Sequence, residues 1–545
     1  MTIQTFILRA RAFVQGAAKE PRVYVVAITL VAFFAYAFFS WATIRQAPRF
    51  NSPDETANYF FSFQVANGVG LSYPEPLSAL SNGVIHPRAT IPVGNDLVPA
   101  SFVGLPMIFG ATALVFGLGV LPYLTAVMTA LALMAAYGCW RCIFNVSVAL
   151  AATVLLAMHP AIWYYASRGF YHNILFLDLV IFSVWGFVHL ERERNSVEWL
   201  IFSIIMFVGA LIVRSSEVLW LFPLALFGLW HLRHHIRLPQ IVIAGSLCAA
   251  LLTTIVLLFT VVYDAPLPVG YQAVRNAASL TAHGNIVSSL LSIIVPFGFH
   301  PLSILTNVFF YCFLVTLPFW MLVFFGGYLR YRERERWSAQ ERSYVYAAVW
   351  VTLTLGVYYG SWRIADTVGP QHITLGISYV RYWLPIFVVW LPFAGYGVMH
   401  LLGNVYKNGS MILVLLLVLG FSSFLQVYFD SSEGLAVVAS RLATYRTVSQ
   451  TVNALTGTDS VIVGDRIDKI FFPERSVISP GDRPFTTYTE VIRVLPTIAD
   501  NVPLYLYSLT GVTPETVELL KQYQVVLHRP FALPDGAWLY PLVHL

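Results

Sequence analysis

The sequence contains few charged residues and few cysteines, and both shortages limit what the protein can be. Aspartate, glutamate, lysine and arginine make up only 11% of the 545 residues, whereas hydrophobic residues make up 58% and the mean hydropathy is +0.70. An ordinary soluble domain carries about 25% charged residues, so this composition excludes that class. The four cysteines all lie in or beside long apolar runs, and none is placed to link an exported loop by a disulfide.

Long apolar runs dominate the chain instead. Runs near or above 18 residues can cross a hydrocarbon core of about 30 Å as helices, and none alternates as a lipid-embedded barrel strand would. The pattern predicts an all-α polytopic membrane protein with about eleven spans. The expected spans are 23–44, 121–140, 146–165, 173–190, 198–213, 218–231, 240–262, 304–328, 343–360, 381–402 and 410–428.

The basic residues indicate topology and not nucleic-acid binding. The net charge is +5, but lysine and arginine gather in short blocks between apolar runs, as they do in cytoplasmic loops. Arg9, Arg11, Lys19 and Arg22 precede the first span, which places the N-terminus in the cytoplasm and the loop 45–119 outside. The apolar piece Leu97–Leu118 is expected to lie along the interface, because a crossing there would move every later basic block outside. An odd number of crossings then exports the C-terminus.

From Asp430 onward the composition becomes that of a soluble domain. Residues 460–464, 504–508 and 523–528 resemble short strands, and Thr513-Pro514 resembles the start of a helix. The expected division is a transmembrane catalytic domain over 1–428, with its first outer loop at 45–119, and a small extracytoplasmic α/β domain over 429–545.

The acidic pair Asp54-Glu55 is the most distinctive polar feature outside the spans. Pro53 disfavours helix at Ser52, so Asp54 is expected to open a new element beside the membrane. Other polar residues stand where outer loops meet spans. The candidates for substrate binding are Tyr59, Arg88, Arg168, His172, Arg214, Glu217, Arg363, His372, Arg381 and Tyr382.

Such a set suits a transfer in which a hydroxyl loses a proton while a phosphate leaves. A carboxylate can act as general base, and fixed cations can stabilise charge on the leaving oxygen. Arginine fits the second role because its planar fork binds two phosphate oxygens. Each residue also has a simpler interpretation: Asp54 as an acid that complements a helix dipole, and each arginine as an interfacial anchor.

The order of these short signals resembles the GT-C superfamily of membrane glycosyltransferases, which includes protein O-mannosyltransferases, lipid A aminoarabinose transferases and oligosaccharyltransferase catalytic subunits. The resemblance is carried by Asp54-Glu55 with Tyr59 after one span, Tyr164-Tyr165-Ala166-Ser167-Arg168, Arg214-Ser215-Ser216-Glu217 and Arg381-Tyr382-Trp383-Leu384-Pro385. It implies a polyprenyl-phosphate-linked sugar donor, Asp54 and Glu55 as catalytic acids with Asp54 the base, and inversion at the anomeric carbon. The acceptor would be a glycan, lipid or protein hydroxyl at the extracytoplasmic face of a bacterial inner membrane.

The second outer loop departs from that resemblance. Where relatives often carry a carboxylate shortly after the arginine, this sequence has Tyr171-His172-Asn173, with Asp178 deeper in the expected span. A divalent ion prefers several oxygen ligands, and only the first loop offers a carboxylate pair. We therefore expect no cofactor, no metal site and no nucleic-acid partner. Binding of a divalent ion is the less favoured alternative.

Two other classes of function remain open. A transporter or flippase of a lipid-linked or small polar substrate would be expected to show internal repeats and paired broken helices. No such pairing is evident, and the polar residues gather at one face. A scaffold in a polysaccharide assembly complex would leave the acidic pair without a role.

Overall fold

The computed structural model describes residues 20–45, 48–100, 102–193, 196–232, 237–265, 296–364, 372–404, 410–479 and 488–545. The chain forms two compact units, each assembled from separate stretches of sequence. The first unit joins Met1–Ser40, Tyr123–Thr253 and Asn276–Val437, and the second joins Trp41–Pro122, Thr254–Arg275 and Val438–Leu545.

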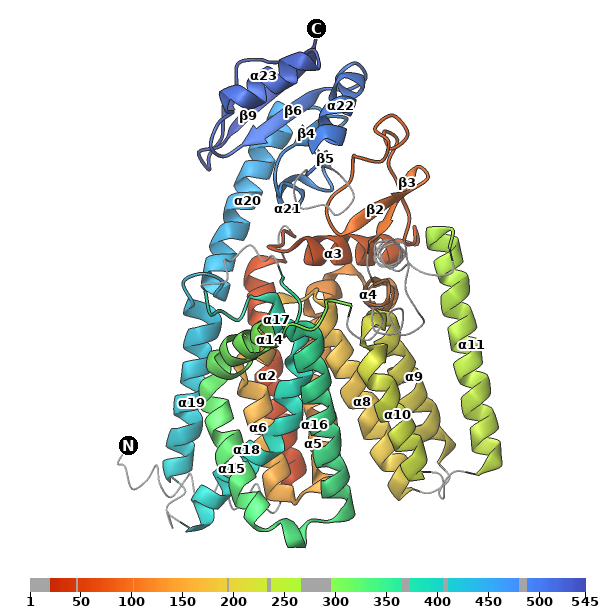
Figure 1. Cartoon of the computed structure of the whole chain (residues 1–545), viewed down its shortest axis with the longest axis vertical. Helices are drawn as coiled ribbons and strands as arrows, with labels where there is room; N and C mark the ends of the chain where they lie inside the picture. Colours follow the sequence, from red (N-terminus) through yellow and green to blue (C-terminus); the bar gives the residue numbers. More distant parts are fainter. Residues whose placement is uncertain are drawn as a thin grey trace. The chain divides into compact units, whose positions relative to one another are not determined.

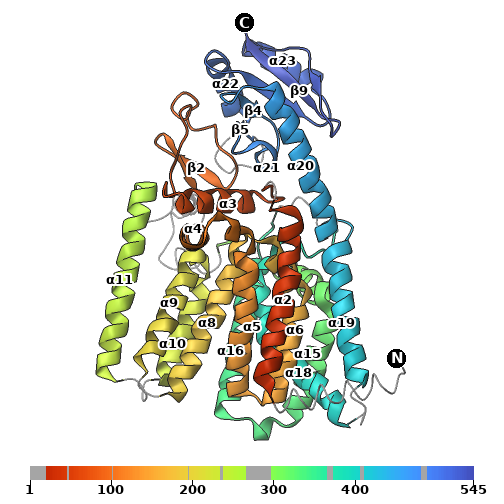
Figure 2. The same cartoon turned by 180° about the vertical axis from the view of Figure 1, so that it is seen from behind.

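The first unit is a bundle of apolar helices. Helices α5, α6 and α8 lie side by side in it, as do α15 and α18 (Figures 1 and 2). This architecture confirms the predicted all-α membrane fold class. The helices are α2 (Pro21–Thr43), α5 (Leu124–Ile143), α6 (Val146–Met158), α7 (Pro160–Arg168), α8 (His172–Arg192), α9 (Val197–Val213), α10 (Val218–Leu232), α11 (Leu238–Tyr263), α14 (Pro301–Asn307), α15 (Leu317–Arg332), α16 (Ala339–Gly360), α17 (Ser378–Tyr382), α18 (Leu384–Asn404) and α19 (Ser410–Phe429), with π and 3-10 turns between α14 and α15. The C-terminal ends of α2 and α11 belong to the second unit.

Three of the expected spans contain or adjoin sharp breaks. The segment 146–165 is helical, but α6 and α7 meet at a bend of 53° because His159 is extended and Pro160 has no N–H to donate. Helices α9 and α10 meet at 113°, with Arg214 extended at the break and a 3-10 turn, η2 (Ser215–Glu217), following it. The second break places Arg214 at the end of α9, whereas Arg168 stands at the far end of α7 from the first break.

The number of membrane crossings remains a prediction. Among the described residues, six helices are long and apolar enough to cross a membrane, or up to eight if each bent pair counts as one span. Helix α19 falls among the shorter apolar helices, as does α4 (Gly104–Phe116).

The second unit begins with helix α3 (Pro53–Ala66), which carries the acidic pair. The Ser52 hydroxyl accepts a hydrogen bond from the Asp54 N–H at 3.3 Å, Pro53 occupies the first turn, and both acids lie in that turn. The expectation that a new element opens at this point is confirmed. The rest of the first loop forms a small antiparallel sheet that the sequence did not reveal, in the order β1 (Tyr73–Pro74), β3 (Asp96–Pro99), β2 (Thr90–Val93). Whether Leu97–Leu118 lies along the interface stays a prediction.

The C-terminal part of the second unit is an α/β layer. The expected strands appear as β4 (Val461–Val463), β6 (Leu504–Ser508) and β7 (Val525–Leu527), and the Thr513 hydroxyl caps α23 (Pro514–Gln522). The sheet order is β5-β4-β6-β9-β7, with β8 (Phe531–Ala532) paired to β9; β5, β4 and β6 are parallel and β9 is antiparallel to its neighbours. Sequence reasoning missed β5 (Ser476–Ile478), β9 (Trp538–His544), α20 (Leu435–Leu455), α21 (Asp468–Phe471) and α22 (Tyr488–Ala499).

The first loop shares a hydrophobic core with this sheet. Val84 and Ile85 pack into the same buried cluster as Val461, Ile478 and Leu504. His86 pairs with Ile478 in a parallel bridge along the edge strand β5, which covers an edge that would otherwise be exposed. The loop that carries Asp54 is therefore braced by the C-terminal sheet.

Candidate active site

Three arginines from different parts of the first unit gather around two tyrosine rings. The Arg168 and Arg381 guanidinium carbons lie 5.3 and 5.1 Å from the centre of the Tyr171 ring. The Arg381 and Arg214 carbons lie 5.3 and 5.0 Å from the centre of the Tyr382 ring. The order along the cluster is thus Arg168, Tyr171, Arg381, Tyr382, Arg214, and we call this set the arginine–tyrosine cluster.

Helix ends position each arginine of the cluster. Arg168 is the last residue of α7, and Gly169, at a φ of 95°, turns the chain toward α8, where Tyr171 is the N-cap. Arg214 stands at the break between α9 and α10, and Arg381 and Tyr382 end the short helix α17. A guanidinium whose face rests on a ring presents its N–H groups at its edge, the geometry in which phosphate oxygens are bound.

Arg214 is fixed by a buried hydrogen-bond network. Its Nε and Nη2 atoms donate to Glu217 Oε1 at 2.9 and 2.6 Å, and Nη2 also donates to the Tyr359 hydroxyl at 2.9 Å. The Trp220 indole N–H donates to the other oxygen of Glu217 at 2.6 Å. The Tyr359 ring stacks on Tyr382 with a centroid distance of 4.4 Å. Because both Glu217 oxygens accept hydrogen bonds, this carboxylate acts as a counterion.

Tyrosine hydroxyls hold Arg168 in part. Its side chain is buried, and its Nη1 and Nη2 atoms donate to the hydroxyls of Tyr164 at 2.7 Å and Tyr171 at 3.2 Å. Arg381 donates to the Ser378 hydroxyl at 3.1 Å and is only half-buried. The cluster thus gathers three guanidinium groups, which are suited to hydrogen bonding with the oxygens of an anion.

The structure therefore brings together Arg168, Arg214, Glu217, Arg381 and Tyr382 out of the predicted set. His172 is buried at the start of α8, while Arg363 and His372 are exposed beside the segment 365–371, which lies outside the described residues. Asp178 is buried, and its Oδ2 accepts a hydrogen bond from Thr129 at 2.8 Å. The sequence analysis did not identify Tyr164, Tyr171, Trp220 and Tyr359 as hydrogen-bond partners of the cluster. Tyr164 and Tyr171 stand close to Arg168 in the sequence, and Trp220 stands close to Glu217. This short spacing could have indicated these three residues, but no such signal exists for Tyr359.

The remaining candidates lie in the second unit. Glu55 is buried in the first turn of α3, whereas Asp54 is half-buried. Arg88 donates from Nε and Nη2 to Asp468 Oδ1 at 3.1 and 2.9 Å, and this ion pair holds the first loop against α21. Its predicted contact with substrate stays a prediction, as do the predicted roles of Asp54, Glu55 and Tyr59.

Over the part of the chain that the structure describes, histidine, cysteine, aspartate and glutamate side chains do not gather in groups of three that could hold a metal ion. Metal independence remains an expectation.

One part of the chain matches a known protein family. Residues 106–259, well under half of the chain, match the family model described as dolichyl-phosphate-mannose-protein mannosyltransferase. No curated protein sequence matches the chain.

Solved structures share the fold. The oligosaccharyltransferase of Archaeoglobus fulgidus, solved with a tethered acceptor peptide, is 12% identical with a TM-score of 0.54, and the match covers 96% of this chain and 74% of that one. ArnT from Cupriavidus metallidurans, bound to undecaprenyl phosphate, is 12% identical with a TM-score of 0.52, covering 96% of this chain and 98% of that one. The family match thus covers the α4–α11 region, and the likeness in fold to these two membrane enzymes covers nearly the whole chain.

Proposed function

We propose that the protein transfers a sugar from a polyprenyl-phosphate donor to an acceptor hydroxyl, with inversion at the anomeric carbon. The observation that carries this proposal is the arginine–tyrosine cluster, in which three guanidinium groups are held over two phenol rings within the first unit. The cluster suits an anion with several oxygens, which matches the phosphate of such a donor. The relatives support the same donor class, since one binds undecaprenyl phosphate and the Archaeoglobus enzyme has been solved with a dolichol-phosphate.

The proposed step needs one base and one leaving group. The acceptor oxygen attacks the anomeric carbon as Asp54 takes the hydroxyl proton, and the bond from that carbon to the phosphate oxygen breaks. The polyprenyl phosphate leaves with the electron pair, and the cluster arginines stabilise the charge on its oxygens. Attack opposite the leaving group inverts the configuration. The basic blocks between spans support placement of this reaction at the extracytoplasmic face, and the likeness to a Cupriavidus enzyme favours a bacterial inner membrane.

The test is a transfer assay on purified full-length protein in lipid, with a panel of polyprenyl-phosphate sugars. Asp54→Asn should lower the transfer rate by about 10²- to 10⁴-fold, the usual contribution of a general base. The chain provides a matched control, because Thr513-Pro514-Glu515 starts α23 as Ser52-Pro53-Asp54 starts α3. Glu515→Gln removes an acid at the same helix position and should leave the rate unchanged. Wild-type turnover by Asp54→Asn would contradict its role as base. If the folded wild-type protein transfers none of the sugars in the panel, transport becomes the favoured function, and a flux assay would measure it.

A further inference from the structure

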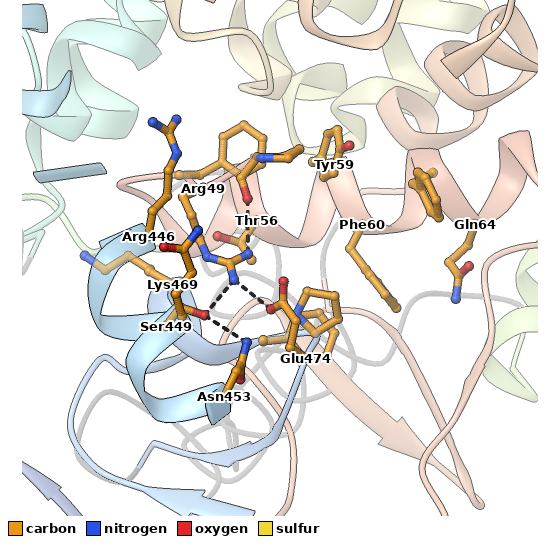
Figure 3. Close-up of a pocket in the computed structure, with 16 residues that line it drawn as sticks. Arg49, Thr56, Tyr59, Phe60, Gln64, Arg446, Ser449, Asn453, Lys469 and Glu474 are labelled. Carbon is orange, nitrogen blue, oxygen red and sulfur yellow. Dashed lines mark hydrogen bonds and ion pairs between the residues drawn. The ribbon is translucent and has the colours of Figure 1, made fainter. Parts of the chain in front are cut away.

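The second unit contains a pocket that the transfer reaction does not use. It has a volume of about 380 Å³ and lies between α3, α20 and the segment that follows α21 (Figure 3). All of its lining residues belong to the second unit. The pocket can therefore be described without reference to the helical bundle.

Positive charge gathers on one side of the pocket. Among the described residues, three cations, Arg49, Arg446 and Lys469, line it together with one carboxylate, Glu474. Arg49 Nη2 lies 2.8 Å from Glu474 Oε2 and donates to the Ser449 hydroxyl at 2.9 Å (Figure 3). Burial and the nearby charge of Arg49 lower the pKa of Arg446, as expected where two cations lie close together. Such an arrangement favours an anion with two negative charges.

Aromatic side chains form the other side. Tyr59, Phe60 and Phe63 reach the pocket from α3, and Phe472 packs against Phe60 with a centroid distance of 4.7 Å. Aromatic faces bind apolar groups and the C–H faces of rings. A ligand that fills both sides needs an anionic end and an apolar or ring-shaped end.

The pocket faces away from Asp54 along α3. Lining residues Thr56, Tyr59 and Phe63 recur at helical spacing on one face of this helix. At 100° per residue, Asp54 and Asn58 fall on the opposite face, whereas Glu55 lies one turn before Tyr59 on the same side. Tyr59, which the sequence analysis grouped with the catalytic acids, also lines this pocket.

We propose that this pocket binds a phosphomonoester attached to an apolar or sugar-ring group, as a site separate from the transfer centre. The phosphate lies among Arg49, Arg446, Lys469 and the Ser449 hydroxyl, and the attached group lies on Tyr59 and Phe60. A phosphomonoester carries a charge of about −1.5 to −2 at pH 7 and three strong acceptor oxygens, which suits a lining of three cationic side chains and a hydroxyl. The proposal does not depend on glycosyl transfer, so its test needs only binding.

The test uses full-length protein in phosphatidylcholine nanodiscs. Glucose 6-phosphate, titrated by calorimetry, represents a soluble source, and phosphatidic acid, counted by native mass spectrometry, represents a lipid source. At least one should bind more tightly than inorganic phosphate. Arg49→Gln should weaken that binding about tenfold, the effect of losing one charge-assisted hydrogen bond. Arg529→Gln, which removes an exposed arginine elsewhere in the same unit, should leave it unchanged.

A second variant distinguishes an effect on binding from misfolding of the protein. Glu474→Gln removes the one carboxylate of the lining and should tighten binding, a gain that an unfolded protein would not show. Binding of glucose 6-phosphate alone would identify the ligand as soluble, and binding of phosphatidic acid alone would identify it as a lipid. The proposal is overturned if neither probe binds, if inorganic phosphate binds as tightly as both, or if Arg49→Gln and Glu474→Gln leave affinity unchanged.

Discussion

Arg214 and Glu217 form a buried ion pair, with Nη2 2.6 Å from Oε1 and side chains only 7% and 4% exposed. Tyr359 and Trp220 complete the hydrogen bonds of the carboxylate. Because both of its oxygens accept hydrogen bonds, Glu217 is suited to hold Arg214 against Tyr382. Two acids therefore have different proposed roles: Glu217 holds an arginine of the cluster, and Asp54 on α3 is the proposed base.

Glu217→Gln should therefore act through Arg214. Removing one partner of a buried ion pair leaves an uncompensated charge and costs about 3–5 kcal/mol. We expect a marked fall in the thermal midpoint of the purified protein together with weaker donor binding. Glu333→Gln is the matched control, because Glu333 also pairs with an arginine three residues away but is 41% exposed. Its cost should stay below about 1 kcal/mol. Equal losses of stability in the two variants would contradict the assigned role of Glu217.

Arg381→Ala tests the cluster as a phosphate site. Arg381 contacts both tyrosine rings of the cluster, so its loss should weaken binding of undecaprenyl phosphate about tenfold, with little change in stability because the side chain is half-buried. Binding can be followed by competition with a labelled polyprenyl phosphate. Arg334→Ala removes an exposed guanidinium that lies 4.8 Å from the Tyr331 ring centre, and serves as the control. An unchanged affinity in Arg381→Ala would remove this residue from the donor site.

The sequence predicted the membrane architecture because composition and charge placement are local properties. Asp54 at the start of a new helix followed from Pro53, and the strand at Leu504–Ser508 followed from its residue types. The three cluster arginines were recognised as candidates because each stands where a loop meets a span. Their arrangement was not predictable: Tyr359 joins Arg214 across 145 positions, and nothing in the local pattern around either residue indicates that contact.

Long-range pairing also explains what was missed in the second unit. The strand Trp538–His544 contains Pro541 and was not recognised, yet it pairs with both Leu504–Ser508 and Val525–Leu527. Arg88 was predicted to contact substrate because it stands in an outer loop, and its ion pair with Asp468, 380 residues away in the sequence, was not predicted. Because the two residues are so far apart in the sequence, no local pattern indicates this ion pair.

The Arg88–Asp468 pair should couple the first loop to α21. Asp468 is fully buried, with its side chain 0% exposed, so Arg88→Met should destabilise the protein by about 3–5 kcal/mol by leaving that carboxylate unpaired. Asp468→Asn combined with Arg88→Met should cost less than the sum of the single changes. Thermal unfolding of the four proteins of this double-mutant cycle measures the coupling. The exposed pair His544–Asp500 provides a comparison in which additive effects are expected.

Gly326 and Gly327 give a test of helix packing in the bundle. A Cβ added at Gly326 would lie 1.8 Å from the Phe393 carbonyl oxygen of α18, whereas one added at Gly327 meets nothing within 4 Å. Small residues let membrane helices approach closely, so Gly326→Ala should force α15 and α18 apart and lower both thermal stability and expression. Gly327→Ala introduces the same atom one position later and should be neutral or stabilise the helix by up to about 1 kcal/mol, because alanine favours helix over glycine. Matched stability of the two variants in detergent and in lipid would contradict the close packing of α15 against α18.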